Sequence, residues 1–209
     1  MDVHVINSLS ERRLSTYERA TNGDRYRASI LYIWNARVAA AFFLPLQCAE
    51  VCLRNRVAAG IAECYGPEWW DEPTFRSGLN GKTISNLDTE VGRLAGQKQR
   101  VDGDQVIASL SFGFWVYMLT GSFNIPIWSR QLRKQFPSLP PVVNREQLRK
   151  QADAALKLRN RISHHEPIIG LDLPAKHDEV IRLIAWMCPA THDWLQPHLT
   201  FDQVFRERP

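Results

Sequence analysis

Apolar residues recur at spacings of three and four positions along most of the chain, and this helical periodicity limits the folds open to it. The clearest run consists of Leu31, Asn35, Val38, Phe42, Leu46, Ala49 and Leu53. Such spacing places side chains on one face of an α-helix. We find no sustained alternation with period two between turn residues, which is the pattern of a half-buried strand. We therefore predict an all-α fold.

Glycine, proline and asparagine divide the chain into helical blocks. We expect helices over residues 8–21, 24–64, 83–96, 145–163 and 175–187, then a short tail that bears tryptophan, with two or three short helices over 104–136 broken at Gly113, Gly121 and Pro126. Ser8 or Ser10 is expected to cap the first helix, and Pro45 to kink or split the second.

Two further local features support this division. Asn144 and Gln147 have the spacing of a capping box at the start of the 145–163 helix. The loop 66–81 contains tryptophans that we expect to anchor it to the core. The length of 209 residues suits one domain, 1–209, and is tight for two.

The composition sets limits on the class of protein. We find no run of the roughly eighteen uncharged apolar residues that a membrane span needs, and no basic-then-apolar start typical of a signal peptide. We therefore expect a cytoplasmic protein without a membrane segment. The four cysteines, Cys48, Cys52, Cys64 and Cys188, include no C-x-x-C pair. Their pattern favours neither a disulfide framework nor a zinc site, and we expect no metal and no cofactor.

Positive charge is concentrated in one stretch. The net charge of the chain is +4, yet nine basic residues against two acidic ones lie between residues 130 and 161. A partner that carries phosphate, RNA above all, is one explanation. A solvated helix face explains the charge equally well.

The segment 157–167 carries the residues with the most chemistry. Leu148, Ala152, Ala155, Arg159 and Ile162 follow one helical stripe. Arg159 thus occupies a position where an apolar residue is expected. A desolvated guanidinium needs a partner, which is either an acid such as Glu50 or an anionic ligand.

Two histidines end the same helix. His164 lies one turn after Asn160 but about 140° from Arg159 around an ideal helix. Fraying of the last turn before Pro167, or a symmetric dimer, is needed to bring arginine and histidine together. An imidazole can transfer a proton near neutral pH, and a guanidinium can stabilise charge on a phosphate. The pair suits attack of a ribose 2′-hydroxyl on the adjacent phosphodiester without a metal.

These residues resemble a known family. Arg159 and Asn160, followed by His164, resemble the Arg–polar–x–x–x–His signature of HEPN ribonucleases. The wider resemblance is to the Abi-like branch, the abortive-infection proteins of phage defence, and rests on three stretches, 31–37 with 50–55, 110–115 and 160–167. It spans roughly residues 8 to 187.

The resemblance implies a HEPN-like helical bundle with additional helices, a homodimer formed through the motif helix, and RNA cleavage that leaves a cyclic phosphate. By position, Arg159 and His164 are the catalytic pair and Asn160 is the polar residue that orients one of them. His165 and Glu166 are supporting residues. The resemblance also implies a role in phage defence or as a toxin, with an antitoxin or regulatory protein as a further partner.

Each assignment has a structural alternative. Arg159 can serve only as one half of a buried ion pair, and His164 only as a cation at a helix end. For His165 and Glu166 a solvated turn is the preferred interpretation. A metal site made of His164, His165 and Glu166 is disfavoured, because adjacent histidines point apart on a helix.

The other polar and aromatic residues of interest also allow two interpretations. Glu50, Arg54 and Asn55 are interpreted as a buried network that positions the motif helix, with contact of Arg54 to phosphate as the alternative. Lys157 and Arg161 are candidates for substrate binding. For the aromatic residues core packing is preferred to base stacking; they are Phe112, Phe114, Trp115 and Trp128.

Two rival functions stay open. One is a non-catalytic HEPN-like module that binds RNA or a partner protein. The other is a toxin component acting on a protein or nucleotide, against which stands the lack of a glycine-rich phosphate loop.

Overall fold

The computed structural model describes residues 3–96 and 101–209, and every regular element in these residues is helical. The predicted all-α fold is confirmed. The longer helices are α2 (Glu11–Ala20), α3 (Arg25–Ala41), α4 (Phe43–Tyr65), α6 (Gly81–Ala95), α9 (Arg145–Ser163) and α10 (Leu173–Met187). The shorter ones are α1 (Val3–Leu9), α5 (Pro73–Ser77), α7 (Gly103–Ser109), α8 (Phe112–Tyr117), α11 (Pro189–Leu195) and α12 (Phe201–Arg206).

Single turns of tighter or wider helix connect these elements. They are the 3-10 turns η1 (Trp69–Asp71), η2 (Gly121–Phe123), η4 (Leu132–Gln135) and η5 (Gln196–His198), and the π-helical turn η3 (Asn124–Trp128). The expected boundaries of α6 and α9 agree with the structure within two residues. Both begin at an asparagine N-cap, whose side chain accepts a hydrogen bond from the third residue of the helix.

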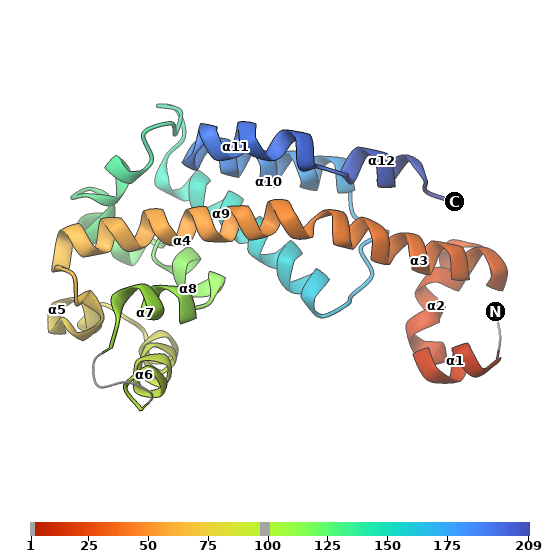
Figure 1. The fold of residues 1–209 in the computed structure, drawn as a ribbon, viewed down its shortest axis with the longest axis horizontal. Helices are drawn as coiled ribbons and strands as arrows, with labels where there is room; N and C mark the ends of the chain where they lie inside the picture. Colours follow the sequence, from red (N-terminus) through yellow and green to blue (C-terminus); the bar gives the residue numbers. More distant parts are fainter. Residues whose placement is uncertain (1–2, 97–100) are drawn as a thin grey trace.

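Helices α3 and α4 form the central spine of the molecule and continue in nearly the same direction (Figure 1). They separate at Phe42, three residues before Pro45, so the split that we expected is present. Pro45 lies in the first turn of α4, where its missing N–H costs little because those amides have no partner within the helix. Asp24 caps α3 through the amides of Tyr26 and Arg27.

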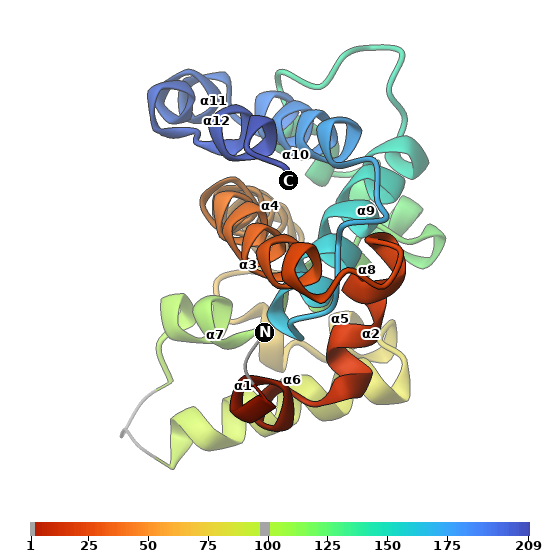
Figure 2. The same cartoon turned by 90° about the vertical axis from the view of Figure 1, so that its right-hand side faces the viewer.

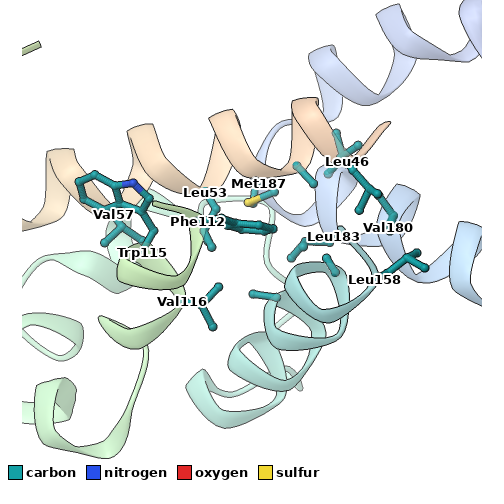
Figure 3. Close-up of a cluster of buried hydrophobic side chains, with 14 of the residues drawn as sticks. Leu46, Leu53, Val57, Phe112, Trp115, Val116, Leu158, Val180, Leu183 and Met187 are labelled. Carbon is teal, nitrogen blue, oxygen red and sulfur yellow. The ribbon is translucent and has the colours of Figure 1, made fainter. Parts of the chain in front are cut away.

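The other long helices pack around this spine. Helix α10 lies along α4, and α9 packs against α10, α4 and α8 (Figures 1 and 2). Figure 3 shows the side chains between them, among which Leu53, Phe112, Leu183 and Met187 are fully buried. Burial of this apolar surface holds α9 against the spine and thereby positions its C-terminal end.

The spine also bears on the membrane prediction. The helical stretch Arg25–Tyr65 is long and apolar enough to cross a membrane by length and composition alone when up to two charged residues are allowed in the window, although it contains no fully uncharged run of eighteen residues. In the structure its residues Val38, Leu46 and Leu53 are buried by neighbouring helices. The central helix of a bundle meets the same two criteria, so the lack of a membrane segment stays a prediction.

Several expected boundaries are wrong. The helix expected over 8–21 is α2, and its N-cap is Ser10, one of the two predicted capping residues, but the preceding helix α1 was not predicted; Ser10, at a positive φ of 69°, separates the two. Gly113 lies inside α8, whose N-cap is Ser111, and it does not interrupt a helix. The tail after Met187 forms α11 and α12, with the Trp34 ring nitrogen donating to the Val204 carbonyl at 2.9 Å.

An aromatic cluster surrounds the C-terminal end of α4. Its members are Trp69, Trp70, Phe75, Phe114 and Trp115, all at most 5% exposed. Trp69 lies at the centre, with ring centroids 5.2 Å from Phe75 and 6.1 Å from Trp115. The expected anchoring of the tryptophan loop is therefore observed. Phe112, Phe114, Trp115 and Trp128 belong to the core, as preferred from the sequence.

Candidate functional site

Helix α9 presents the motif residues, and its two ends are both well defined. At the start, Asn144 and Gln147 form both hydrogen bonds of the capping box. The predicted stripe of Leu148, Ala152 and Ala155 is buried. These contacts fix the rotation of α9 about its axis and hence the direction in which its last two turns project.

Arg159 forms a forked ion pair with Glu50 of α4. Its Nε lies 3.2 Å from Glu50 Oε2, and its Nη2 lies 3.2 Å from Oε1. The remaining nitrogen, Nη1, donates to Asn160 Oδ1 at 3.2 Å. The Arg159 side chain is nevertheless 37% exposed and lines a hollow between α4 and α9. The guanidinium is thus held by protein groups while one side of it faces solvent.

The last turn of α9 is ordered, so the fraying that we considered is wrong. The amide of Glu166 donates to the Arg161 carbonyl, and the amide of His165 donates to the Ile162 carbonyl, each at 2.9 Å. These two bonds make a Schellman motif, with His165 in the left-handed region at φ 55°. Glycine is the residue that usually adopts this conformation. A histidine here lowers the stability of the folded state by about 1 kcal/mol.

Three side chains hold this turn, and two of them are distant in sequence. Arg13 of α2 donates through Nη1 to the His165 carbonyl at 2.7 Å. Arg161 donates to the Pro167 carbonyl at 2.9 Å. Buried Asn35 of α3 accepts from the Ile168 amide at 2.8 Å. The turn between α9 and α10 is therefore fixed from both α2 and α3.

His164, His165 and Glu166 are all exposed. His164 lies between two hollows. We call the first the α10 hollow, lined by Lys157, Asn160, Arg161, His164 and Lys176 among others. We call the second the α2 hollow, lined by Arg12, Arg13, Thr16, His164 and His165 among others.

The structure does not bring the predicted catalytic pair together within one chain. Arg159 lines the hollow with Glu50 and Arg54, whereas His164 lines the α2 and α10 hollows. Asn160 connects the two sides, because it accepts from Arg159 and lines the α10 hollow. The 140° separation expected for an ordered helix is the reason.

The expected buried network of Glu50, Arg54 and Asn55 is only partly as predicted. Glu50 binds Arg159 on α9. Arg54 is half-buried and donates to Asn55 at 3.3 Å, while Asn55 is exposed. The network is therefore not buried, because Asn55 follows Arg54 on the solvent side of α4. Arg54 lines the same hollow as Arg159.

Many cations of the basic stretch are paired within the chain. Lys157 lies 2.8 Å from Asp153, and Arg149 lies 2.7 Å from Glu146. Arg133 donates to the carbonyls of Phe136 and Leu139. Much of the positive charge in residues 130–161 is thus engaged in ion pairs and hydrogen bonds within the chain. Among the described residues, no three His, Cys, Asp or Glu side chains gather closely enough to hold a metal ion.

Sequence reasoning missed four residues that shape the site. They are Arg12, Arg13, Asn35 and Lys176. Asn35 had a visible signal, since it is an amide on an otherwise apolar stripe. Arg12 and Arg13 had none, because their proximity to His165 depends on how α2 packs.

Comparison of the chain with protein-family models, with curated proteins and with solved structures finds no match.

Proposed function

We propose that this chain is a metal-independent endoribonuclease of the HEPN type whose site lies at the C-terminal end of α9. One observation carries the proposal. His164 is exposed on an ordered turn between two hollows that both have cationic side chains. An exposed imidazole can accept the proton of a ribose 2′-hydroxyl, and neighbouring guanidinium and ammonium groups bind the phosphates of the strand.

The proposed reaction uses groups that the substrate and the chain supply. His164 accepts the 2′-hydroxyl proton while the oxygen attacks the adjacent phosphorus. Arg159 stabilises the charge that builds on the phosphate oxygens, and Asn160 orients its guanidinium through their hydrogen bond. The bond between phosphorus and the 5′-oxygen breaks as the 2′,3′-cyclic phosphate forms, and the leaving 5′-oxygen takes its proton from water.

The separation of Arg159 and His164 within one chain adds a second element to the proposal. We place the complete site between two copies, so that Arg159 of one protomer and His164 of its partner face the same phosphate. A two-fold axis generates two such sites per dimer. In this arrangement the hollow beside Arg159 and the hollows beside His164 are each incomplete until a second copy binds.

Cleavage of a mixed cellular RNA in excess EDTA tests the activity. The wild type should produce 2′,3′-cyclic phosphate ends, while His164→Ala and Arg159→Ala should each lose cleavage. His198→Ala is a matched control, because His198 is also exposed and lines neither hollow. Equal activity of His164→Ala and wild type would refute the catalytic role of His164.

Mixing the two inactive variants tests the shared site. Random exchange should restore about a quarter of the wild-type activity, since half of the dimers then carry one intact site of two. If arginine and histidine of the same chain act together, no mixed dimer has an intact site and the mixture stays inactive.

A second function is favoured by the ion pair of Arg159. Both nitrogens that face Glu50 are engaged at 3.2 Å, as in a purely structural pair. This favours a non-catalytic module that binds RNA or a partner protein. A folded protein that binds RNA but leaves it intact, with or without His164, would support this alternative. Phage defence and an antitoxin stay predictions.

A further inference from the structure

The two hollows beside His164 differ in how their cations are used. In the α10 hollow, Lys157 lies 2.8 Å from Asp153. Lys176 lies 2.7 Å from Glu179 in the same way. Arg161 lies 3.7 Å from Glu166, whose side chain also lines this hollow. Each of these cations has a carboxylate partner, so the positive potential in this hollow is reduced.

In the α2 hollow the cations are less compensated. The Arg12 side chain is exposed and has no ion pair or hydrogen bond among the residues that the structure describes. Arg13 donates through Nη1 to the His165 carbonyl, a neutral acceptor that does not compensate the guanidinium charge. The carboxylate lining this hollow belongs to Glu166, which lies 3.7 Å from Arg161.

Two hydroxyl groups complete this hollow, from Ser10 and Thr16. The Ser10 oxygen accepts from the Arg13 amide at 3.4 Å, and the Thr16 oxygen accepts from Arg19 at 3.4 Å. Each hydroxyl keeps its own proton for a ligand oxygen. Two guanidinium groups with adjacent hydroxyl donors make a phosphate-binding set.

We infer that the α2 hollow is a phosphate subsite, in which Arg12 and Arg13 bind the phosphate of an RNA strand next to the one at His164. Because His164 lines both hollows, a strand that enters the α2 hollow passes this histidine. The subsite rests on the proposed function for the identity of its ligand as RNA. It adds substrate-binding residues from α2, outside the motif helix.

Binding of a single-stranded RNA oligonucleotide with 2′-O-methyl riboses tests the subsite. Such an oligonucleotide has no free 2′-hydroxyl, so binding is measured without cleavage. Fluorescence anisotropy over a series of salt concentrations gives both Kd and its salt dependence. Arg12→Ala is the test variant, because an exposed side chain without a partner can be removed with little effect on folding.

Arg27→Ala is the matched control, since Arg27 is exposed on α3, lines neither hollow and carries the same charge. We expect Arg12→Ala to raise Kd about fivefold and to lower the slope of log K against log salt by about 0.7, the loss of one phosphate contact to a single strand. Arg27→Ala should change neither. Equal changes in both variants, or none in Arg12→Ala, would overturn the subsite.

The test separates this inference from the proposed function. If Arg12→Ala weakens binding as expected but the wild type never cleaves RNA, the subsite stands and the ribonuclease proposal fails. If the wild type cleaves RNA through His164 and Arg12→Ala cleaves with the same KM, the subsite fails and the activity stands. A wild type that does not bind the oligonucleotide overturns the subsite.

Discussion

At the C-terminal end of α4 the chain is held together by aromatic side chains, whereas at the C-terminal end of α9 it is held by hydrogen bonds. In the first region Trp69 is surrounded by Trp70, Phe75 and Trp115, with ring centroids 5.2 to 6.1 Å away. In the second region Arg13, Asn35 and Arg161 each bind one backbone group of the turn that follows α9.

The difference has a physical consequence. Aromatic packing buries a large area and contributes much stability without fixing any single polar atom. Hydrogen bonds contribute about 1 kcal/mol each, but they fix particular atoms and allow the residues between them to stay exposed. The first region therefore supports the fold, and the second sets the position of His164. The predictions below test this division.

The largest effect is expected in the aromatic region. Trp69 is 1% exposed, so Trp69→Ala should lower the free energy of unfolding by about 3–5 kcal/mol through lost burial and the cavity left behind. Urea denaturation followed by circular dichroism measures this. Trp194, which is 61% exposed, is the control, and Trp194→Ala should cost less than about 0.5 kcal/mol. Similar losses for both tryptophans would contradict the division.

An intermediate effect is expected from Asn35. Asn35→Leu keeps the apolar stripe of α3 but leaves the Ile168 amide without its acceptor. We expect a loss of about 1–3 kcal/mol in the free energy of unfolding. Amide hydrogen exchange should also rise at Ile168 and leave the aromatic region unchanged. If exchange rises equally in both regions, the turn is not independently held.

The free energy of unfolding is expected to depend on pH through His177, which packs in the core as an aromatic ring. His177 is 9% exposed and stacks on Phe201 with ring centroids 4.4 Å apart. Burial lowers the pKa of His177 below its usual 6.5, although Asp202 and Asp178 act in the opposite direction. The unfolded state then binds the proton more readily than the native state below pH 6.5.

The stability that neutral His177 contributes should therefore be present above pH 6.5 and be lost as the pH falls toward its folded pKa. Urea denaturation at pH 7.5 and at pH 5.5 should show this loss in the wild type. His177→Phe keeps the ring and should show a smaller loss over the same interval. An identical pH dependence in both proteins would exclude His177 as its source.

The smallest effect, and one of opposite sign, is expected at His165. Because its φ is 55°, His165→Gly should raise the free energy of unfolding by about 0.5–1 kcal/mol. A small rise in thermal midpoint measures it. His164→Gly is the comparison, since glycine at that right-handed position should be destabilising. A loss of stability in His165→Gly would mean that the imidazole makes contacts that outweigh the backbone strain.

The helices and the interior of this molecule could be predicted from sequence, while the environment of the motif could not. Local signals fixed α9, since Asn144 and Gln147 are three residues apart and specify its start by themselves. The break predicted at Gly113 is wrong, because a glycine inside a short helix gives the same local sequence signal as a helix break. Gly113 faces α9, and a methyl group added to its Cα would lie 3.8 Å from Leu156 Cδ2.

Arg159 and His164 show what a local pattern can and cannot predict. The apolar stripe predicted a partner for this arginine, and Glu50 was named as one from the sequence. The hollows beside His164 were not foreseen, because they form only where α2 and α10 meet the end of α9. No short-range pattern encodes such a meeting.

The hydrogen bond between Arg13 and His165 joins residues 152 positions apart in the chain. During synthesis α2 is made long before the last turn of α9. Until that turn has been made, Arg13 cannot form its hydrogen bond to the His165 carbonyl. The neighbourhood of His164 can therefore be completed only after residue 165 has been synthesised, whereas contacts within α3 and α4 can form earlier. We expect a nascent chain that stops before α9 to be largely helical and yet to lack this neighbourhood altogether.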